Sequence, residues 1–310
     1  MPAGSHLARI ARTVGADGEL FARLAALQAA DLRAAFLDVA ARRAARLRPA
    51  DVLKRYETVG TVQPSSADPA AQRRFECSAM ELLPDGFVEL LLAPHAPLGA
   101  SSVLGGLSQD RILTTIADTE VVSDSTNVLA LECARRRRDP RARRESEPTR
   151  LAAVHQLLRP HDGAHFRLVA LCTAGRDRGS FAMQTQALRE HLEWHVAVIT
   201  RHAPELALDV RVTNLSNGSR RPVLDEQLLR PLRAAWPAID VDFDDERQAG
   251  RTYYTDVCFA VHAVEPDGSR SFLSDGGFTD WTARLLADGK ERVLISGLGG
   301  ERLLGLTGVE

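Results

Sequence analysis

Two short stretches of the chain carry side chains that suit the binding of charged groups. In the run Val122–Thr126, the Asp124 carboxylate and the Thr126 hydroxyl can both accept hydrogen bonds from an ammonium group. The same aspartate could instead cap a helix that begins after it. At a predicted hairpin tip, the Arg159 guanidinium could hold a phosphate or a carboxylate, or it could be an ordinary surface arginine. Each stretch alone leaves a binding role and a structural role open.

The last part of the chain holds a tyrosine pair and two glycine-rich stretches. Tyr253 and Tyr254 open a strand-like run, a predicted turn at Asp275-Gly276-Gly277 follows, and the end reads Ser296-Gly297-Leu298-Gly299-Gly300-Glu301-Arg302. Glycines leave room for a ligand, because they place no side chain in its way. Taken alone, the Gly-Leu-Gly-Gly run is typical of a tight loop before a C-terminal helix, so binding needs support from other positions.

The cysteines and histidines form no metal-binding pattern. Cys77, Cys133, Cys172 and Cys258 lie far apart in the sequence, which favours buried thiols in a reducing cytoplasm over a zinc site. Two histidines, at 191 and 195, would share one helix face, but no third ligand accompanies them. We predict no metal bound by protein ligands alone.

The composition is that of a globular protein without a membrane span. The chain is 45% hydrophobic and 26% charged, and its net charge of −2 gives no overall basic field of the kind that binds nucleic acid. No apolar run approaches the roughly 18 residues of a membrane helix. Residues 1–26 contain no signal-peptide core. We therefore predict a cytoplasmic protein with no membrane partner.

The spacing of apolar residues predicts an α+β fold. Recurring apolar positions predict helix over residues 18–53, and we assign 1–70 to an N-terminal helical region and 71–310 to one continuous core. Because strands and helices do not alternate regularly, we expect an antiparallel sheet flanked by helices. The predicted strands are 75–83, 87–92, 112–122, 151–158, 166–171, 208–212, 240–243, 253–264, 270–272 and 293–296, and the other predicted helices are 127–138, 180–201, 223–235 and 278–288.

An arginine-rich run extends from Arg135 to Arg144, at the end of a predicted helix, where positive charge suits the helix dipole. It is either a solvated helix end or a patch for an acidic partner such as RNA or an acidic carrier protein. No aromatic residue interrupts it, so stacking of bases is not expected there.

Taken in order, these stretches resemble the catalytic core of class II aminoacyl-tRNA synthetases, in particular the histidyl-tRNA synthetase branch, over residues 75–308. In that family an Arg-Pro-Glu-x-Thr loop holds the ammonium group of the amino acid, and Val122–Thr126 is similar to it, with Asp124 for the glutamate. The family's second motif ends in Phe-Arg-x-Glu, and here Arg159 stands in the arginine place and His161 in the glutamate place. The resemblance implies that Arg159 bridges the α-phosphate of ATP and the substrate carboxylate.

The later stretches continue the resemblance. The family's Arg-Gly-Leu-Asp-Tyr-Tyr is similar to residues 249–254, but Ala249 falls in the arginine place, so Arg247 or Arg251 is the candidate substitute. Residues 276–280 resemble the family's Gly-Gly-Arg-Tyr-Asp. Residues 297–302 resemble its third motif, which implies that Arg302 lies against ATP.

The resemblance therefore implies a set of site residues, with ATP and Mg²⁺ as cofactors. The catalytic residues would be Arg159 and Arg302, the substrate would be bound by Asp124, Thr126, Arg251, Tyr253, Tyr254, Gly276 and Gly277, and ATP by Arg159, His161, Phe166, Gly297, Gly299 and Arg302. Glu120 or Glu132 could hold the metal ion, or each could have an ordinary structural role.

Three departures from the family narrow the function. The loop between Arg159 and Phe166 is very short, although the family uses it to hold the acceptor end of tRNA. Leu168 and Cys172 replace the glutamine and glutamate that contact histidine, so histidine is not the expected substrate. The chain ends at Glu310, which leaves no room for an anticodon-binding domain, and we expect full tRNA not to be a partner.

Three hypotheses remain. The chain could activate an amino acid with ATP and pass it to a carrier protein or a small-molecule amine. It could be a non-catalytic regulator, like the regulatory subunit of ATP phosphoribosyltransferase, which is a histidyl-synthetase paralogue. It could also be an unrelated α+β protein. Family cores dimerise through their first motif, which corresponds here to Gly86–Gly99, so the resemblance implies a homodimer.

Overall fold

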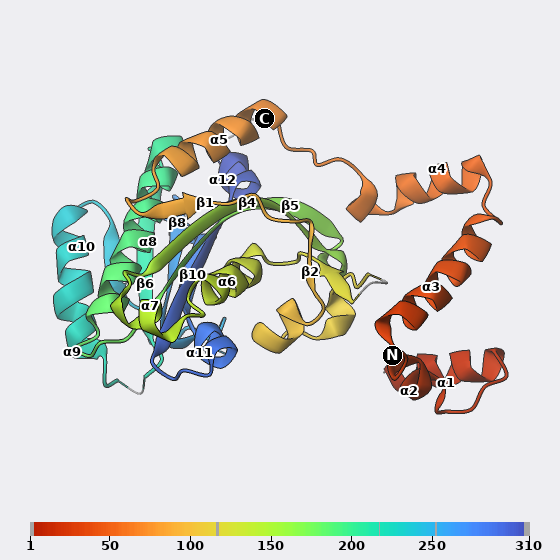
Figure 1. The fold of residues 1–310 in the computed structure, drawn as a ribbon. Coiled ribbons are helices and arrows are strands. Elements are labelled where there is room, and N and C mark those ends of the chain that lie inside the picture. Colours follow the sequence, from red (N-terminus) through yellow and green to blue (C-terminus); the bar gives the residue numbers. More distant parts are fainter. Residues whose placement is uncertain (1–2, 116–117, 217, 252, 307–310) are drawn as a thin grey trace.

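The computed structural model describes residues 3–115, 118–216, 218–251 and 253–306 (Figure 1). An eight-stranded sheet forms its centre, in the order β1-β4-β5-β10-β9-β8-β6-β7. The β1–β4 and β6–β7 pairs are parallel, and every other pair in this sheet is antiparallel. The strands are β1 (Phe87–Glu89), β4 (Thr149–Arg159), β5 (Ala164–Arg176), β6 (Ala207–Asn214), β7 (Asp240–Phe243), β8 (Thr255–Val264), β9 (Arg270–Thr279) and β10 (Glu291–Gly299), with β2 (His95–Pro97) and β3 (Thr119–Val121) forming a separate pair.

Helices cover both faces of the sheet. Successive residues of a strand point to opposite faces, and in β10 Leu294 packs in one hydrophobic cluster while Ile295 packs in another. The first cluster includes Leu188 and Trp194 of α8, and the second includes Leu129 of α6. The helices of the core are α5 (Pro69–Glu81), α6 (Ser125–Arg136), α7 (Pro140–Glu145), α8 (Ala182–His202), α9 (Arg221–Leu224), α10 (Arg230–Ala235), α11 (Trp281–Leu286) and α12 (Gly300–Leu306).

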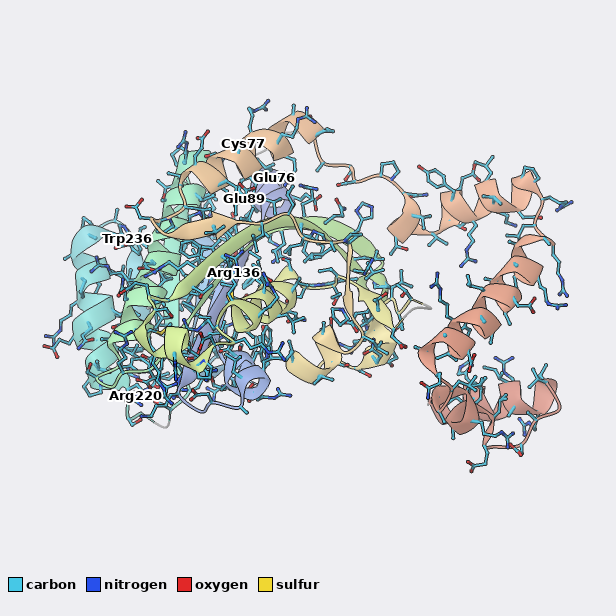
Figure 2. All side chains as sticks on the ribbon, in the orientation of Figure 1. Glu76, Cys77, Glu89, Arg136, Arg220 and Trp236 are labelled. Atoms are coloured by element: carbon cyan, nitrogen blue, oxygen red, sulfur yellow. The ribbon has the colours of Figure 1, made fainter. Side chains whose placement is uncertain are left out.

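Four N-terminal helices, α1 (Ala3–Thr13), α2 (Leu20–Ala25), α3 (Ala29–Ala44) and α4 (Pro49–Thr58), project away from the sheet (Figure 1). Their side chains extend outward along most of their length (Figure 2). The stretch that follows α4 contacts the core, where the His165 ring lies 2.5 Å from the carbonyl oxygen of Gln63 and Ser65 donates to Glu301.

Most predicted elements are present, but the helix predicted over residues 18–53 is divided into α2, α3 and the start of α4, and three further predictions need correction. Residues 75–83, predicted as a strand, are mainly helical in α5, because Asp68 caps that helix by accepting from the amides of Ala70 and Ala71, and Pro69 starts it. Among the described residues of the strand predicted at 112–122, only β3 and an isolated bridge at Thr114 form. The stretch Asp275-Gly276-Gly277 is not a turn, because β9 continues through it to Thr279.

The buried histidines of α8 differ in their partners. His191 contacts the hydroxyls of Thr173 at 2.9 Å and Ser296 at 2.8 Å. His195 is fully buried beside Trp194 and Phe259, and neither of its ring nitrogens has a hydrogen-bond partner among the described residues. Burial lowers the pKa of His195 to about 3. The ring is therefore neutral in the folded protein at pH 7.

His195 should make the stability depend on pH. The unfolded ring titrates near 6.5 and the folded ring near 3, so the unfolded state binds the extra proton and stability falls between these pH values as the solution is acidified. The slope from one such group is about 1.4 kcal/mol per pH unit. We expect His195→Leu to flatten this dependence in urea unfolding measured from pH 7 to pH 4. Equal slopes for the variant and the wild type would contradict the assignment.

No helix of the described residues is long and apolar enough to cross a membrane. The four cysteines are free thiols, but the prediction of buried thiols is wrong for Cys77, which is exposed on α5. Cys133, Cys172 and Cys258 are buried, and the sulfurs of Cys133 and Cys172 lie 3.5 Å apart in the core. Within the described ranges, no group of three or more His, Cys, Asp or Glu side chains could hold a metal ion.

Candidate active site

A cavity of about 520 Å³ brings most of the predicted site residues together. Its lining residues lie mainly on β5, β9 and β10, at the start of α6 and in the tyrosine pair before β8. The predicted residues that line it are Asp124, Thr126, Arg159, Phe166, Tyr253, Tyr254, Gly297, Gly299 and Arg302. They come from distant parts of the sequence, and antiparallel pairing of β10 with both β5 and β9 brings several of them together.

Asp124 has the capping role that the sequence left open, and it also lies in the wall of the cavity. It is the N-cap of α6 and accepts hydrogen bonds from the Thr126 amide at 2.9 Å and the Thr126 hydroxyl at 2.7 Å. Both residues also line the cavity. Since an ionised carboxylate has about four lone-pair sites, capping leaves acceptor capacity for a ligand ammonium group.

Two arginines supply positive charge to the cavity. The Arg159 guanidinium lies 4.9 Å from the centre of the Phe166 ring, and its Nε donates to the Ser123 carbonyl at 3.2 Å. The Arg302 guanidinium lies 5.2 Å from the centre of the Phe272 ring. Neither arginine forms an ion pair with any described residue, so both charges are available to an anionic ligand.

The tyrosine pair also lines the cavity, and next to it lies a partly buried ion pair that was not predicted. The rings of Tyr253 and Tyr254 lie 4.2 Å apart, and burial raises the pKa of Tyr253 to about 12. Behind them, Arg247 donates to Asp275 at 2.8 Å and to the carbonyls of Phe259 and Ala249. Burial raises the pKa of Asp275, and Arg247 opposes this shift. Asp275 lines the cavity.

Arg251 does not reach the cavity. It is exposed and donates to the backbone carbonyls of Arg247 and Asp245, so it holds the loop that precedes the tyrosines. Of the two arginines that the sequence offered, Arg247 is the one packed behind the site, with its Nε and both terminal nitrogens already bonded within the protein. The signal that could have found it is the short separation between Arg247 and the Tyr253–Tyr254 pair.

Gly276 and Gly277 also do not line the cavity, and the structure shows a steric reason for them. A Cβ on Gly277 would lie 2.5 Å from Cδ1 of Tyr254 and 2.6 Å from Cβ of Cys258. A Cβ on Gly276 would lie 2.5 Å from Cβ of Ser296 and 2.6 Å from the Ile295 carbonyl. These glycines allow the tyrosine and the neighbouring strands to pack closely against β9.

We expect Gly277→Ala to push Tyr254 out of place and to destabilise the fold. Overpacking of this kind typically costs about 1–3 kcal/mol, which urea unfolding can measure. Gly289→Ala is the matched control, because its Cβ would meet nothing within 4 Å. A Gly277→Ala variant as stable as the control would show that the tyrosine can move without cost.

A second cavity of about 290 Å³ adjoins the first. The two share Asp124, Arg159 and Tyr253 as lining residues. His161, predicted for ATP, lines this second cavity and not the first, together with Arg111 and Trp281. The two cavities therefore meet at Arg159.

The two glutamates considered for a metal ion have structural partners. Glu120 is fully buried and accepts from the amides of Gly99 at 2.9 Å and Ser101 at 2.7 Å, which fixes the turn before the π-helix η2 (Ala100–Leu104). Arg135, hydrogen-bonded to Glu132, lowers the pKa of that carboxyl to about 2. Neither glutamate lines the main cavity.

The arginine-rich run is largely engaged within the fold. Arg135 and Arg136 pair with Glu132, while Arg137 and Arg143 are buried against Glu291. Four of the run's arginines are therefore held in ion pairs, which supports the structural interpretation over a free patch for an acidic partner.

The fold is that of a class II synthetase catalytic core, as solved structures show. Apo S. aureus histidyl-tRNA synthetase is similar with a TM-score of 0.61 and 17% identity, over 80% of this chain and 70% of that one. An ATP phosphoribosyltransferase regulatory subunit/histidyl-tRNA synthetase from Bacillus halodurans C matches with a TM-score of 0.58 and 14% identity, over 78% of this chain and 81% of that one. A histidine–tRNA ligase subunit from Alicyclobacillus acidocaldarius matches with a TM-score of 0.55 and 14% identity, over 79% of this chain and 95% of that one.

No protein-family model matches the sequence, and no curated protein matches it. The likeness therefore concerns the fold, and there the prediction of an α+β, class II synthetase-like core is confirmed.

Proposed function

We propose that this chain is a stand-alone, cytoplasmic class II synthetase-like enzyme that activates an amino acid with ATP. The single observation that supports this most is the cavity itself, whose wall holds Asp124, Thr126 and two arginines that form no ion pair with any described residue. One cavity would thus offer contacts to both the anionic and the cationic groups of a ligand. We further propose that residues 71–310 form the catalytic core and residues 1–70 a separate helical region.

The proposed reaction has two steps. A carboxylate oxygen of the amino acid attacks the α-phosphorus of ATP, a C–O–P linkage forms, and pyrophosphate leaves. An amine or thiol on a carrier protein or small molecule then attacks the acyl carbon, the C–O bond breaks, AMP leaves and the acceptor's proton passes to solvent. Full tRNA is not the proposed acceptor.

The residues at hand suit the first step. The Arg159 guanidinium, shared by both cavities, would stabilise the charge that develops at the α-phosphate, and its planar fork can also hold a carboxylate. Phe166 and Phe272, each beside an arginine, offer faces for a nucleobase. The backbone of β10 at Gly297 and Gly299 carries no side chain that would obstruct the nucleotide.

Mg²⁺ usually binds through ATP phosphates together with one or two carboxylates. Glu301, next to Arg302 in the cavity wall, is the carboxylate that would hold such an ion, and the ion would neutralise phosphate charge.

One observation favours a second candidate, a non-catalytic regulatory subunit like that of ATP phosphoribosyltransferase. Arg247 donates to Asp275 and to two backbone carbonyls, so its own guanidinium is not free to bind a substrate carboxylate. Such a cavity could bind an amino acid without activating it.

ATP–pyrophosphate exchange against a panel of amino acids tests the proposal, with Arg302→Ala as the control. Exchange with one amino acid that disappears in the variant would establish adenylate formation and identify the substrate. The absence of exchange, together with calorimetric binding of histidine, would instead support the regulatory candidate.

We also propose a homodimer formed through the Gly86–Gly99 region. The edge strand β1 begins this region, and Leu91, directly after it, is 95% exposed. An edge strand followed by an exposed leucine suits pairing with a second chain.

A further inference from the structure

The large apolar side chains that remain exposed are concentrated in two segments. Among the described residues, twelve of them lie between Leu7 and Val62, and six lie between Val88 and Leu113. Only Phe272, Leu285 and Leu306 are found elsewhere. We name residues 3–62 the arm and residues 86–113 the flank.

The helices α2, α3 and α4 of the arm have little tertiary support in the single chain, whereas α1 buries Ala11. None of the residues in α2, α3 or α4 is buried. Helices of 6 and 10 residues, as in α2 and α4, are marginal in water on their own, because most helical stability comes from packing an apolar face. In α3, Leu32, Phe36 and Val39 form such a face, and Phe36 and Val39 are exposed. The arm therefore needs a surface to cover it.

The flank offers an uncovered surface of the same kind. It starts at the edge strand β1 and continues through η2, and its exposed residues include Leu91, Val103 and Leu107. The arm leaves these side chains exposed in its own chain and projects away from the sheet (Figure 1). The arm and the flank do not cover each other within one chain. The arm of one chain can instead cover the flank of a second chain.

The charges of the arm and of the rest of the chain are complementary. Residues 1–62 contain ten Lys and Arg against six Asp and Glu, which gives a net charge of +4. Because the whole chain has a net charge of −2, the remaining residues carry −6. A second copy of this chain therefore presents both an apolar flank and an acidic body to the basic arm.

We infer that the arm of each protomer packs on the flank of a second copy, in a reciprocal exchange that closes a two-fold dimer. In such a two-fold dimer the contact between arm and flank occurs twice, so that neither the arm nor the flank of either chain remains uncovered. The inference rests on the dimer proposed above, and it does not depend on the proposed reaction.

Two full-length variants test the exchange, Phe36→Glu in the arm and Leu91→Glu in the flank. Both side chains are exposed, so neither change should disturb the core. Ala41→Glu, on the opposite face of α3, is the matched control. We expect mass photometry and light scattering to show a wild-type and control dimer, and at least a tenfold weaker dimer for each of the other variants.

Mixing the two weakened variants distinguishes exchange from folding of the arm onto its own body. A mixed dimer keeps one intact contact, in which the unchanged arm of the flank variant meets the unchanged flank of the arm variant. Recovery of dimer on mixing supports exchange, and no recovery overturns it.

Two further outcomes would also overturn the inference. A monomeric wild-type chain would remove both the exchange and the proposed dimer. A wild-type dimer that Phe36→Glu leaves unchanged would remove only the exchange. If Phe36→Glu instead weakened binding to bulk tRNA without changing the dimer, the basic arm would be a nucleic-acid contact.

Discussion

Arg159→Gln is expected to reduce ATP–pyrophosphate exchange by roughly 10²–10³-fold, the usual effect of losing one group that stabilises developing charge. The guanidinium has no ion-pair partner among the described residues, lies over Phe166 and belongs to the walls of both cavities. Its loss should therefore lower the rate constant more than it weakens substrate binding. Arg159→Lys should recover only part of the activity, because an ammonium group cannot make the paired contacts of a planar guanidinium.

Arg189→Gln is the matched control for this prediction. Arg189 pairs with Glu193 on the exposed surface of α8 and lines neither cavity of the site. The prediction is tested by steady-state rates of ATP–pyrophosphate exchange for Arg159→Gln, Arg159→Lys, Arg189→Gln and the wild type. If Arg159→Gln exchanged as fast as Arg189→Gln, the charge would be stabilised elsewhere, and Arg302 would be the next residue to test.

The sequence predicted many of the residues that line the cavity because they lie at fixed places along regular elements. Arg159 ends β4, Asp124 caps α6, and Gly297 and Gly299 lie within β10. Turn signals in the sequence locate the ends of strands and helices well, and pairing of the strands then brings the residues at these ends together. The roles of these side chains remain predictions.

The features that were missed depend on contacts across the fold. The Arg247–Asp275 pair joins two residues separated by most of a hairpin, and only packing shows which nearby arginine turns inward. The predicted turn at Gly276 and Gly277 was wrong because glycine also allows close packing within a sheet. The strand predicted at 75–83 failed for a local reason, since the Asp68-Pro69 helix start was overlooked.

The arginine-rich run shows how burial decides between two interpretations of one sequence. Arg137 and Glu291 have almost no exposed surface, and two hydrogen bonds of 2.7 and 3.1 Å join them. Arg143 lies 3.8 Å from the same carboxylate. Glu291 starts β10, so this cluster ties the loop after α6 to a central strand of the sheet.

Glu291→Gln is therefore expected to destabilise the protein by about 3–5 kcal/mol, because it leaves a buried guanidinium without its counter-charge. Urea unfolding at neutral pH measures this, and Glu132→Gln is the control. Glu132 holds Arg135 and Arg136 near the surface, where ion pairs contribute at most about 1 kcal/mol.

The double variant Arg137→Met with Glu291→Leu distinguishes the effect of an unpaired buried charge on stability from the effect of side-chain packing. Replacing both partners of a buried ion pair with apolar residues is often nearly neutral, whereas removing one leaves the other desolvated and unpaired. We expect the double variant to be more stable than Glu291→Gln, although it lacks more polar contacts. A double variant less stable than the single one would mean that Arg137 matters chiefly for its contacts with the loop at Ser146 and Glu147, and not for its charge.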